Sequence, residues 1–223
     1  MTGTGAPRPR ILTSTFKSLQ LLTLLSEQPT PLTLGGISEL SDQPKASVHQ
    51  QLRTLVEAGF VTQHSDGSYQ VSLSTISLGY AALEQQRLGS PVAAGVAALA
   101  ARSGEAASLS VLRNDEIFIL YRVSLDSSIL TDLAPGSRMP ADVSASGRVL
   151  RAFSSDRSDD QELAQIRSQG FAISSNEFLV GMTTIAVPVR LPGSEIAALS
   201  LAAPTVRFDQ SRLLTLLTRS RVL

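Results

Sequence analysis

The sequence predicts an α+β protein with an N-terminal winged helix-turn-helix, a linker helix, and a C-terminal domain of mixed strands and helices. Three observations carry this prediction. A short helix, a turn, a longer helix and a hairpin follow one another over 34–69, helical spacing of apolar residues returns over 73–88, and strand patterns begin at 106. The predicted division is a DNA-binding domain at 1–72, a linker helix at 73–90 and a second domain at 91–223.

The first domain is predicted to contain three helices. Residues 16–26 have apolar side chains at helical spacing, and the prolines of the following Gln-Pro-Thr-Pro segment end that helix. Thr33 is a suitable N-cap for a short helix over 34–40. Pro44 suits the first turn of the next helix, and Gly59 is placed to end it. The apolar stripe of that third helix consists of Val48, Leu52, Leu55 and Val56.

A β-hairpin and two further helices are expected next. Residues 60–63 and 69–72 alternate around Asp66-Gly67, a pair that favours a tight hairpin turn. Helical spacing then resumes until Gly89 breaks it. Ser90 is expected to cap, and Pro91 to open, a helix that ends at Ser103-Gly104.

The second domain is predicted to alternate between strands and helices. Expected strands cover 107–112, 117–123, 128–133, 171–173, 184–190 and 195–201, and expected helices cover 145–153, 160–169 and 210–221. This order of elements indicates an α+β sensor-like domain.

Composition argues against most catalytic chemistry. The chain has no cysteine, only two histidines (His49 and His64) and only two lysines (Lys17 and Lys45). We therefore expect no metal, no cofactor and no enzyme activity, with a carboxylate-based enzyme as an alternative. The acidic run of Asp156, Asp159, Asp160 and Glu162 resembles a solvated loop instead. No signal-peptide pattern and no apolar run of about 18 residues is present, so we expect a cytoplasmic protein with no membrane partner.

The outward face of the third helix carries the candidate DNA contacts. The second helix of a helix-turn-helix enters the major groove, where Gln50 and Arg53 would read adenine and guanine. Lys45, Ser47 and Thr54 would contact phosphates, and Arg8 and Arg10 would form an arm in an adjacent groove. Ala46 shares this face and His49 lies at its edge.

The charge of residues 1–84 supports the alternative of an ordinary solvated helix. Five Lys/Arg stand against six Asp/Glu, a net charge of −1, although DNA-binding domains are usually basic. A single DNA-binding domain would then bind double-stranded DNA weakly, and a dimer on two half-sites would supply the remaining affinity.

Short motifs along the whole chain resemble the isocitrate-lyase-regulator (IclR) family of bacterial transcription factors. In the first part, Pro44-Lys45-Ala46-Ser47-Val48-His49, Gly59-Phe60-Val61 and Leu78-Gly79 resemble its recognition helix, strand entry and linker. In the second part, the matching segments are Gly136 to Pro140, Ser144 to Arg148, Arg167 to Ala172, Glu177 with Gly181, Ala186 to Val189 and Ala198 to Leu201.

The resemblance implies a GAF-like effector-binding domain and a homodimer or dimer of dimers on a palindromic operator. Small organic acids, aromatic or short keto acids, are the implied effectors. Three departures stand out: Gln50 replaces an arginine, Asp142 replaces a pocket-edge histidine, and the segment after Phe153 is about twenty or more residues shorter than is typical.

A candidate effector site follows from the residues and the resemblance together. The Ser144-Ala145-Ser146-Gly147 segment opens a helix, whose free N–H groups favour a carboxylate. The matching family positions Ser174, Thr184 and Ser200 would add hydroxyl donors. An apolar wall would come from Leu109, Val111, Leu120, Leu130 and Met139. The alternatives are that Ser144 only caps its helix, and that the second domain serves dimerisation alone in a ligand-independent DNA-binding protein.

Overall fold

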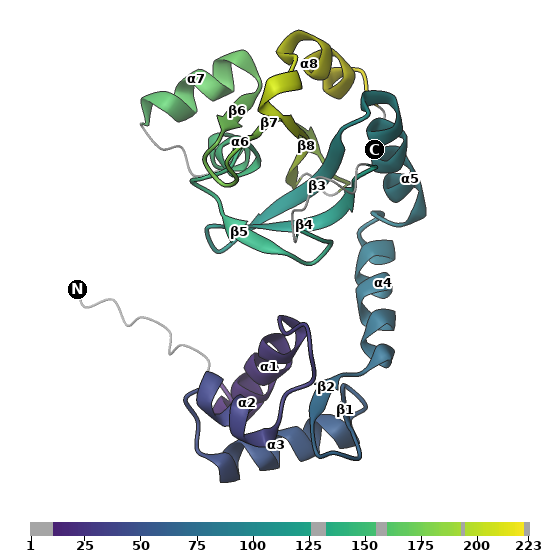
Figure 1. The fold of residues 1–223 in the computed structure, drawn as a ribbon, viewed down its shortest axis with the longest axis vertical. Coiled ribbons are helices and arrows are strands. Elements are labelled where there is room, and N and C mark those ends of the chain that lie inside the picture. Colours follow the sequence, from purple (N-terminus) through teal and green to yellow (C-terminus); the bar gives the residue numbers. More distant parts are fainter. Residues whose placement is uncertain (1–10, 126–132, 155–159, 193–194, 221–223) are drawn as a thin grey trace, which may run out of the picture. The chain divides into compact units, whose positions relative to one another are not determined.

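A computed structural model describes residues 11–125, 133–154, 160–192 and 195–220 of the chain (Figure 1). The chain divides into two compact units, 1–82 and 83–223, which are described here one at a time.

The first unit is a three-helix domain with a small hairpin. Its elements are α1 (Thr13–Ser26), α2 (Leu34–Leu40), α3 (Lys45–Glu57), β1 (Val61–Gln63) and β2 (Tyr69–Val71). Helix α1 contacts α3 and β2, while α2 contacts α3. The core of this unit consists of Leu21, Leu25, Ile37, Val48, Leu52, Leu55, Val61 and Tyr69. The predicted stripe of the third helix therefore faces the core, with Val56 packed partly buried against it.

Hydrogen bonds explain where α2 begins and where α3 ends. The Thr33 hydroxyl accepts from the Gly36 N–H at 3.3 Å, as a cap should. Gly59 has φ +79°, and its N–H donates to the Val56 carbonyl. The N–H of Phe60 donates to the Leu55 carbonyl, which completes a Schellman motif. Pro44 lies at the N-cap of α3, one position before the first helical residue.

The wing is held by strand pairing and by its turn. Strands β1 and β2 are antiparallel, and Leu32 forms an isolated bridge to Tyr69 on the other edge of β2. At the tip, an oxygen of Asp66 accepts from the Ser68 hydroxyl at 2.6 Å and from the Ser68 N–H at 2.9 Å. These two hydrogen bonds, led by the one from the hydroxyl, lower the pKa of the fully exposed Asp66 carboxyl.

A pH titration of the wing should show this effect. Hydrogen bonds to the ionised form depress the folded pKa, so the stabilisation is complete above the ordinary value of 3.8 and is lost as pH falls through the lower folded value. We expect the Ser68 amide resonance to titrate with a midpoint below 3.8 in NMR spectra. A midpoint at or above 3.8 would contradict these hydrogen bonds.

The helices after the wing differ in detail from the expected ones. The expected helix over 73–88 begins as a 3₁₀ turn, η1 (Leu73–Thr75), and continues as α4 (Ile76–Gln85). Helix α5 (Ser90–Ser103) has Gly89 rather than Ser90 at its N-cap position, so that expectation was one residue off. Pro91 stands in its first turn and Gly104, with φ +70°, ends it as predicted.

The second unit is built on one antiparallel sheet with the strand order β5-β4-β3-β8-β7-β6. Helices α5 and α8 (Gln210–Thr218) pack on one face of this sheet, and α6 (Ala145–Phe153) packs on the other with α7 (Gln161–Gln169) beside it (Figure 1). The strands are β3 (Ala106–Arg113), β4 (Glu116–Val123), β5 (Arg138–Pro140), β6 (Ala172–Ser175), β7 (Met182–Arg190) and β8 (Ile196–Pro204). The predicted α+β class is confirmed.

The sheet differs from the expected strands mainly at its edge. Strand β5 was not predicted, because three residues ending in a proline are too short to show alternation. It pairs with β4, Met139 opposite Ile117. The strand expected over 128–133 lies outside the described residues except for Leu133. A 3₁₀ turn, η2 (Thr205–Arg207), connects β8 to the last helix.

Candidate DNA-reading face and ligand cavity

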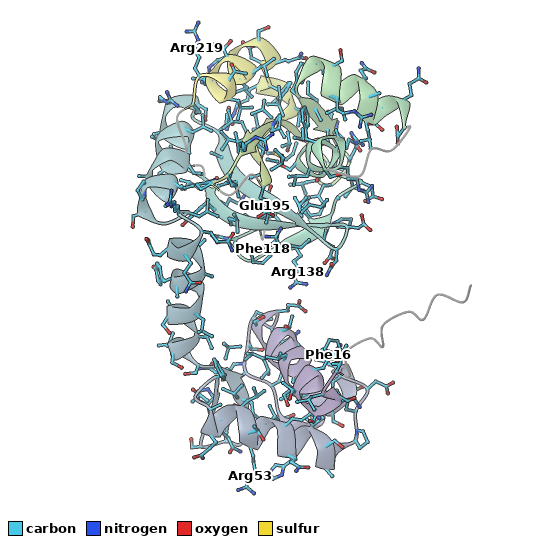
Figure 2. The ribbon with its side chains drawn as sticks, turned by 180° about the vertical axis from the view of Figure 1, so that it is seen from behind. Phe16, Arg53, Phe118, Arg138, Glu195 and Arg219 are labelled. Carbon is cyan, nitrogen blue, oxygen red and sulfur yellow. The ribbon has the colours of Figure 1, made fainter. Side chains whose placement is uncertain are left out.

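Within the first unit, the outward face of α3 is exposed to solvent. Exposed side chains cover it from the first turn to the last, and Figure 2 shows Arg53 extending away from the helix. Every predicted contact on this helix is exposed: Lys45, Ala46, Ser47, His49, Gln50, Arg53 and Thr54. Glu57 is exposed on the same helix, so one carboxylate accompanies the cations. Arg8 and Arg10 lie outside the described residues.

Two side-chain hydrogen bonds involve residues of α3. The Thr54 hydroxyl donates to the Gln50 carbonyl at 3.0 Å, which leaves its oxygen lone pairs as the outward-facing polar group. The Gln51 amide donates to the Gln43 side-chain oxygen at 3.0 Å. That bond ties the helix to the turn before it, so the reading face is supported from behind by packing and hydrogen bonding.

A cavity lies in the second unit, between the sheet face covered by α6 and the β6–β7 connection. It contains about 650 Å³ of empty space, part of which is open solvent. Its polar lining residues are Ser108, Ser110, Arg122, Ser144, Ser146, Ser174, Glu177, Thr184 and Ser200. Its apolar lining residues are Ile117, Ile119, Leu133, Met139, Phe178, Leu179, Met182 and Ala202.

Small side chains on this face of the sheet create the space. Along β3 and β8, serines and alanines alternate with leucines and valines, and the large residues point toward α5 and α8. The small residues cannot fill the gap below α6. The alternation of small with large residues was the signal in the sequence that would have located this cavity.

Six of the eight predicted effector residues line the cavity. They are Met139, Ser144, Ser146, Ser174, Thr184 and Ser200. Ala145 and Gly147 do not line it, and their N–H groups are occupied. The Ala145 N–H donates to the Ser174 hydroxyl at 3.2 Å, and the Gly147 N–H donates to the Ser144 hydroxyl at 3.0 Å. Ser144 therefore caps α6, as the simpler interpretation of that residue expected.

The predicted apolar wall was largely wrong. Leu109 and Val111 are buried in the core beneath α5 and α8, and Leu120 packs against the same core. Leu130 lies outside the described residues, so only Met139 of the five lines the cavity. The prediction placed these side chains on the wrong face of the sheet. Adjacent residues of a strand point to opposite faces, and β3 is buried on both.

A β-bulge brings an unpredicted arginine into the cavity. Leu109 pairs with Tyr121 and Ser110 with Ile119, so one extra residue of β4 stands at this point. The bulge shifts the alternation, and Arg122 joins Ile117 and Ile119 on the cavity face. Tyr121 instead turns toward α5, where its hydroxyl donates to the Leu88 carbonyl at 2.6 Å. Sequence alternation alone could not have found Arg122.

Arg122 and Glu177 are the charged side chains among the described lining residues. Arg122 donates to the Ser108 hydroxyl at 3.0 Å, and its partial burial lowers the pKa of the guanidinium. Glu177 forms a bidentate ion pair with Arg148, which also contacts Glu162 at 3.3 Å. Asp142, expected at the pocket edge, is exposed and lies outside the lining.

No group of three or more His, Asp or Glu side chains among the described residues is arranged to hold a metal ion. Asp160 caps α7, with its carboxylate accepting from the Glu162 and Leu163 N–H groups, while Asp156 and Asp159 lie outside the described residues. Among the described helices, none is long and apolar enough to cross a membrane.

Comparison with known proteins agrees with this architecture. A profile of the IclR helix-turn-helix domain matches residues 14–65, and one of the bacterial transcriptional regulator IclR C-terminal domain matches 80–161 and 160–221. The Pca regulon regulatory protein of Pseudomonas putida is 28% identical over 231 residues, covering 92% of this chain and 79% of its own length.

Solved structures share the fold. The IclR transcriptional regulator from Alicyclobacillus acidocaldarius superposes with a TM-score of 0.80 at 22% identity, covering 94% of this chain and 96% of that one. An IclR homolog from Microbacterium hydrocarbonoxydans, solved in complex with 4-hydroxybenzoate, gives 0.79 at 21% identity, covering 92% and 94%. The two family profiles together match most of the sequence, and the chain belongs to the IclR family of transcriptional regulators, with a DNA-binding helix-turn-helix.

Proposed function

We propose that this regulator binds a palindromic operator as a homodimer or dimer of dimers, and that a small organic acid modulates the binding. The observation that carries the effector part is the cavity, which is lined by serine hydroxyls, one arginine and apolar side chains. The solved homolog in complex with 4-hydroxybenzoate adds support, because it shares the fold and its ligand is a compact aromatic acid.

Exposed apolar side chains support the dimer. On η1 and α4, the exposed large residues are Leu73, Ile76, Leu78 and Tyr80, and on α1 they include Phe16 and Leu19. Large apolar side chains that are exposed in such numbers are typical of protein–protein contacts. Residues 73–90 would then link the DNA-binding part (1–72) to the effector-binding part (91–223). Through this link, a bound ligand would change the relative placement of the two DNA-binding domains of the dimer.

The proposal is tested by mobility shift on the intergenic DNA beside the protein's own gene. We expect a shift at micromolar protein and low salt, and a change in apparent affinity when carboxylic acids are added. A shift that no acid alters would favour the alternative of a ligand-independent dimeric regulator. No shift under any condition would contradict the DNA-binding surface of α3.

Filling the cavity should abolish ligand-dependent stabilisation. Ser146→Trp or Thr184→Trp places a large ring among the lining residues. In wild type, an acid at 100 times its Kd should add about 2.7 kcal/mol to the unfolding free energy. We expect both variants to lose the corresponding rise in Tm, measured by scanning fluorimetry.

Val206→Trp is the matched control for these two variants. Val206 is 97% exposed on η2 and does not line the cavity. Its tryptophan variant should keep the full ligand-dependent rise in Tm. Unchanged stabilisation in both cavity variants would remove Ser146 and Thr184 from the effector site.

A further inference from the structure

The polar part of the cavity is built on the sheet rather than on the helix above it. Arg122, Ser108 and Ser200 stand directly opposite one another on the adjacent strands β4, β3 and β8. Adjacent strands are about 4.8 Å apart, so these three residues form a short continuous row. All three line the cavity.

Arg122 supplies a desolvated positive charge to this row. Its guanidinium is partly buried at the cavity wall, with one N–H donated to Ser108. Arginine stays protonated in proteins, and its planar fork of donors matches a carboxylate. Because low dielectric strengthens charge–charge attraction, an anion in this cavity gains more from Arg122 than it would at the surface.

Ser110 provides a second, independent observation that points to a ligand. Its side chain is 1% exposed, and its oxygen has no hydrogen-bond partner among the described residues. Ser110 lies two residues from Ser108 on the same face of β3, about 7 Å along the strand. A buried hydroxyl without a partner is costly, and a polar group of a ligand would satisfy it.

The N-terminus of α6 competes poorly for the same anion. Two of its first three N–H groups already donate to Ser174 and Ser144. The other charged lining residue, Glu177, is an anion engaged with Arg148 and would repel a second carboxylate. The rest of the lining combines neutral hydroxyl groups, such as those of Ser146 and Thr184, with apolar side chains. The β4–β3–β8 row therefore favours a single negative charge, and the remainder of the cavity, which is uncharged apart from Glu177, favours an uncharged body with apolar surface.

We propose that Arg122 anchors the effector's carboxylate and that the effector is a monocarboxylate with an apolar body, whose polar substituent reaches Ser110. This inference rests on the proposed effector function and refines it. It places the acid at the β4–β3–β8 row, away from the first turn of α6, and it disfavours dicarboxylates and very small keto acids.

Calorimetric titration with matched acid and amide probes tests the anchor. The probes are benzoate, phenylacetate and 4-methylpentanoate, each paired with its neutral amide. We expect wild type to bind at least one acid roughly 10- to 100-fold more tightly than its amide, because charge-assisted hydrogen bonds are the strong ones. Arg122→Gln should remove that preference while leaving amide affinity unchanged, and Arg122→Lys should restore part of it.

The control variant is Arg138→Gln, an exposed arginine on the edge strand β5 that does not line the cavity. It should keep the acid preference. Equal acid preference in wild type and Arg122→Gln would overturn the anchor while leaving the cavity as an effector site. No binding of any acid or amide to wild type at millimolar concentration would overturn both the anchor and the proposed effector function.

Ser110→Ala tests the second contact. We expect a ring-hydroxylated benzoate to bind wild type several-fold more tightly than benzoate, and the variant to bind both equally. An unchanged hydroxyl preference in Ser110→Ala would remove Ser110 from the site. Circular dichroism of each variant verifies that the sheet domain is folded.

Discussion

Replacing Gly147 with alanine is expected to destabilise the second domain by about 3 kcal/mol or more. Gly147 is buried in the first turn of α6, and a Cβ at this position would overlap the carbonyl oxygen, Cα and carbonyl carbon of Ala141. Backbone atoms cannot move aside as a flexible side chain does. Helix α6 contacts β3, β4, β6, β7 and β8, so any displacement disturbs the packing over most of the sheet.

Gly79→Ala is the matched control for this variant. Gly79 lies within α4, and a Cβ there would have nothing within 4 Å. Alanine favours helix over glycine, so this change should be neutral or stabilising by up to about 1 kcal/mol. Differential scanning calorimetry of wild type and both variants separates the two outcomes. A Tm of Gly147→Ala equal to that of wild type would contradict the close contact with Ala141.

The helices of the first domain were predictable because each signal there is local. Thr33 and Gly59 act through hydrogen bonds within a few residues, and the stripe from Val48 to Val56 repeats at helical spacing. The Asp66-Gly67 turn likewise depends only on its neighbours. Such signals depend little on tertiary context, and the sequence contains them in full.

The cavity was only partly predictable because its geometry depends on strand partners. Strand β3 is buried on both faces, so only the alternation of small Ser108 and Ser110 with large Leu109 and Val111 distinguishes its cavity face from its core face. Arg122 lies on the cavity face because of a β-bulge, and no local sequence motif indicates that bulge. The serines near α6 were found through motif resemblance, and capping by Ser144 was an alternative that the sequence offered. The hydrogen bond from the Ala145 N–H to Ser174 joins segments distant in the sequence, so no local signal indicates it.

Arg53→Ala is expected to weaken operator binding by about 1–3 kcal/mol for each DNA-binding domain, and by about twice that for a dimer on two half-sites. Arg53 is exposed on α3 and is the cation best placed to pair with a guanine edge (Figure 2). In a domain with a net charge of −1, few other cations are present to compensate for its loss. Fluorescence anisotropy with labelled operator DNA at fixed salt measures the change.

Arg219→Ala is the control for loss of positive charge. Arg219 is exposed in the second domain, far from α3 in the sequence, and its removal should leave operator affinity unchanged. Equal affinity of Arg53→Ala and wild type across several operator sequences would exclude Arg53 from the DNA contacts. A uniform loss on all sequences would instead assign it to phosphate contact, since only base contacts discriminate between operators.

Gln50→Arg adds a positive charge to the same face of α3, whereas Arg53→Ala removes one. Gln50 is exposed one helical turn before Arg53, so an arginine here would add a second cation to the face that is proposed to enter the groove. We expect higher affinity for non-specific DNA and a salt dependence steeper by about one phosphate contact per DNA-binding domain. Preference for adenine at the contacted position should fall, because the glutamine amide that pairs with adenine is gone. An unchanged salt slope together with unchanged base preference would show that residue 50 does not touch DNA. The DNA contacts of α3 would then be assigned to Arg53 and to the first turn of the helix.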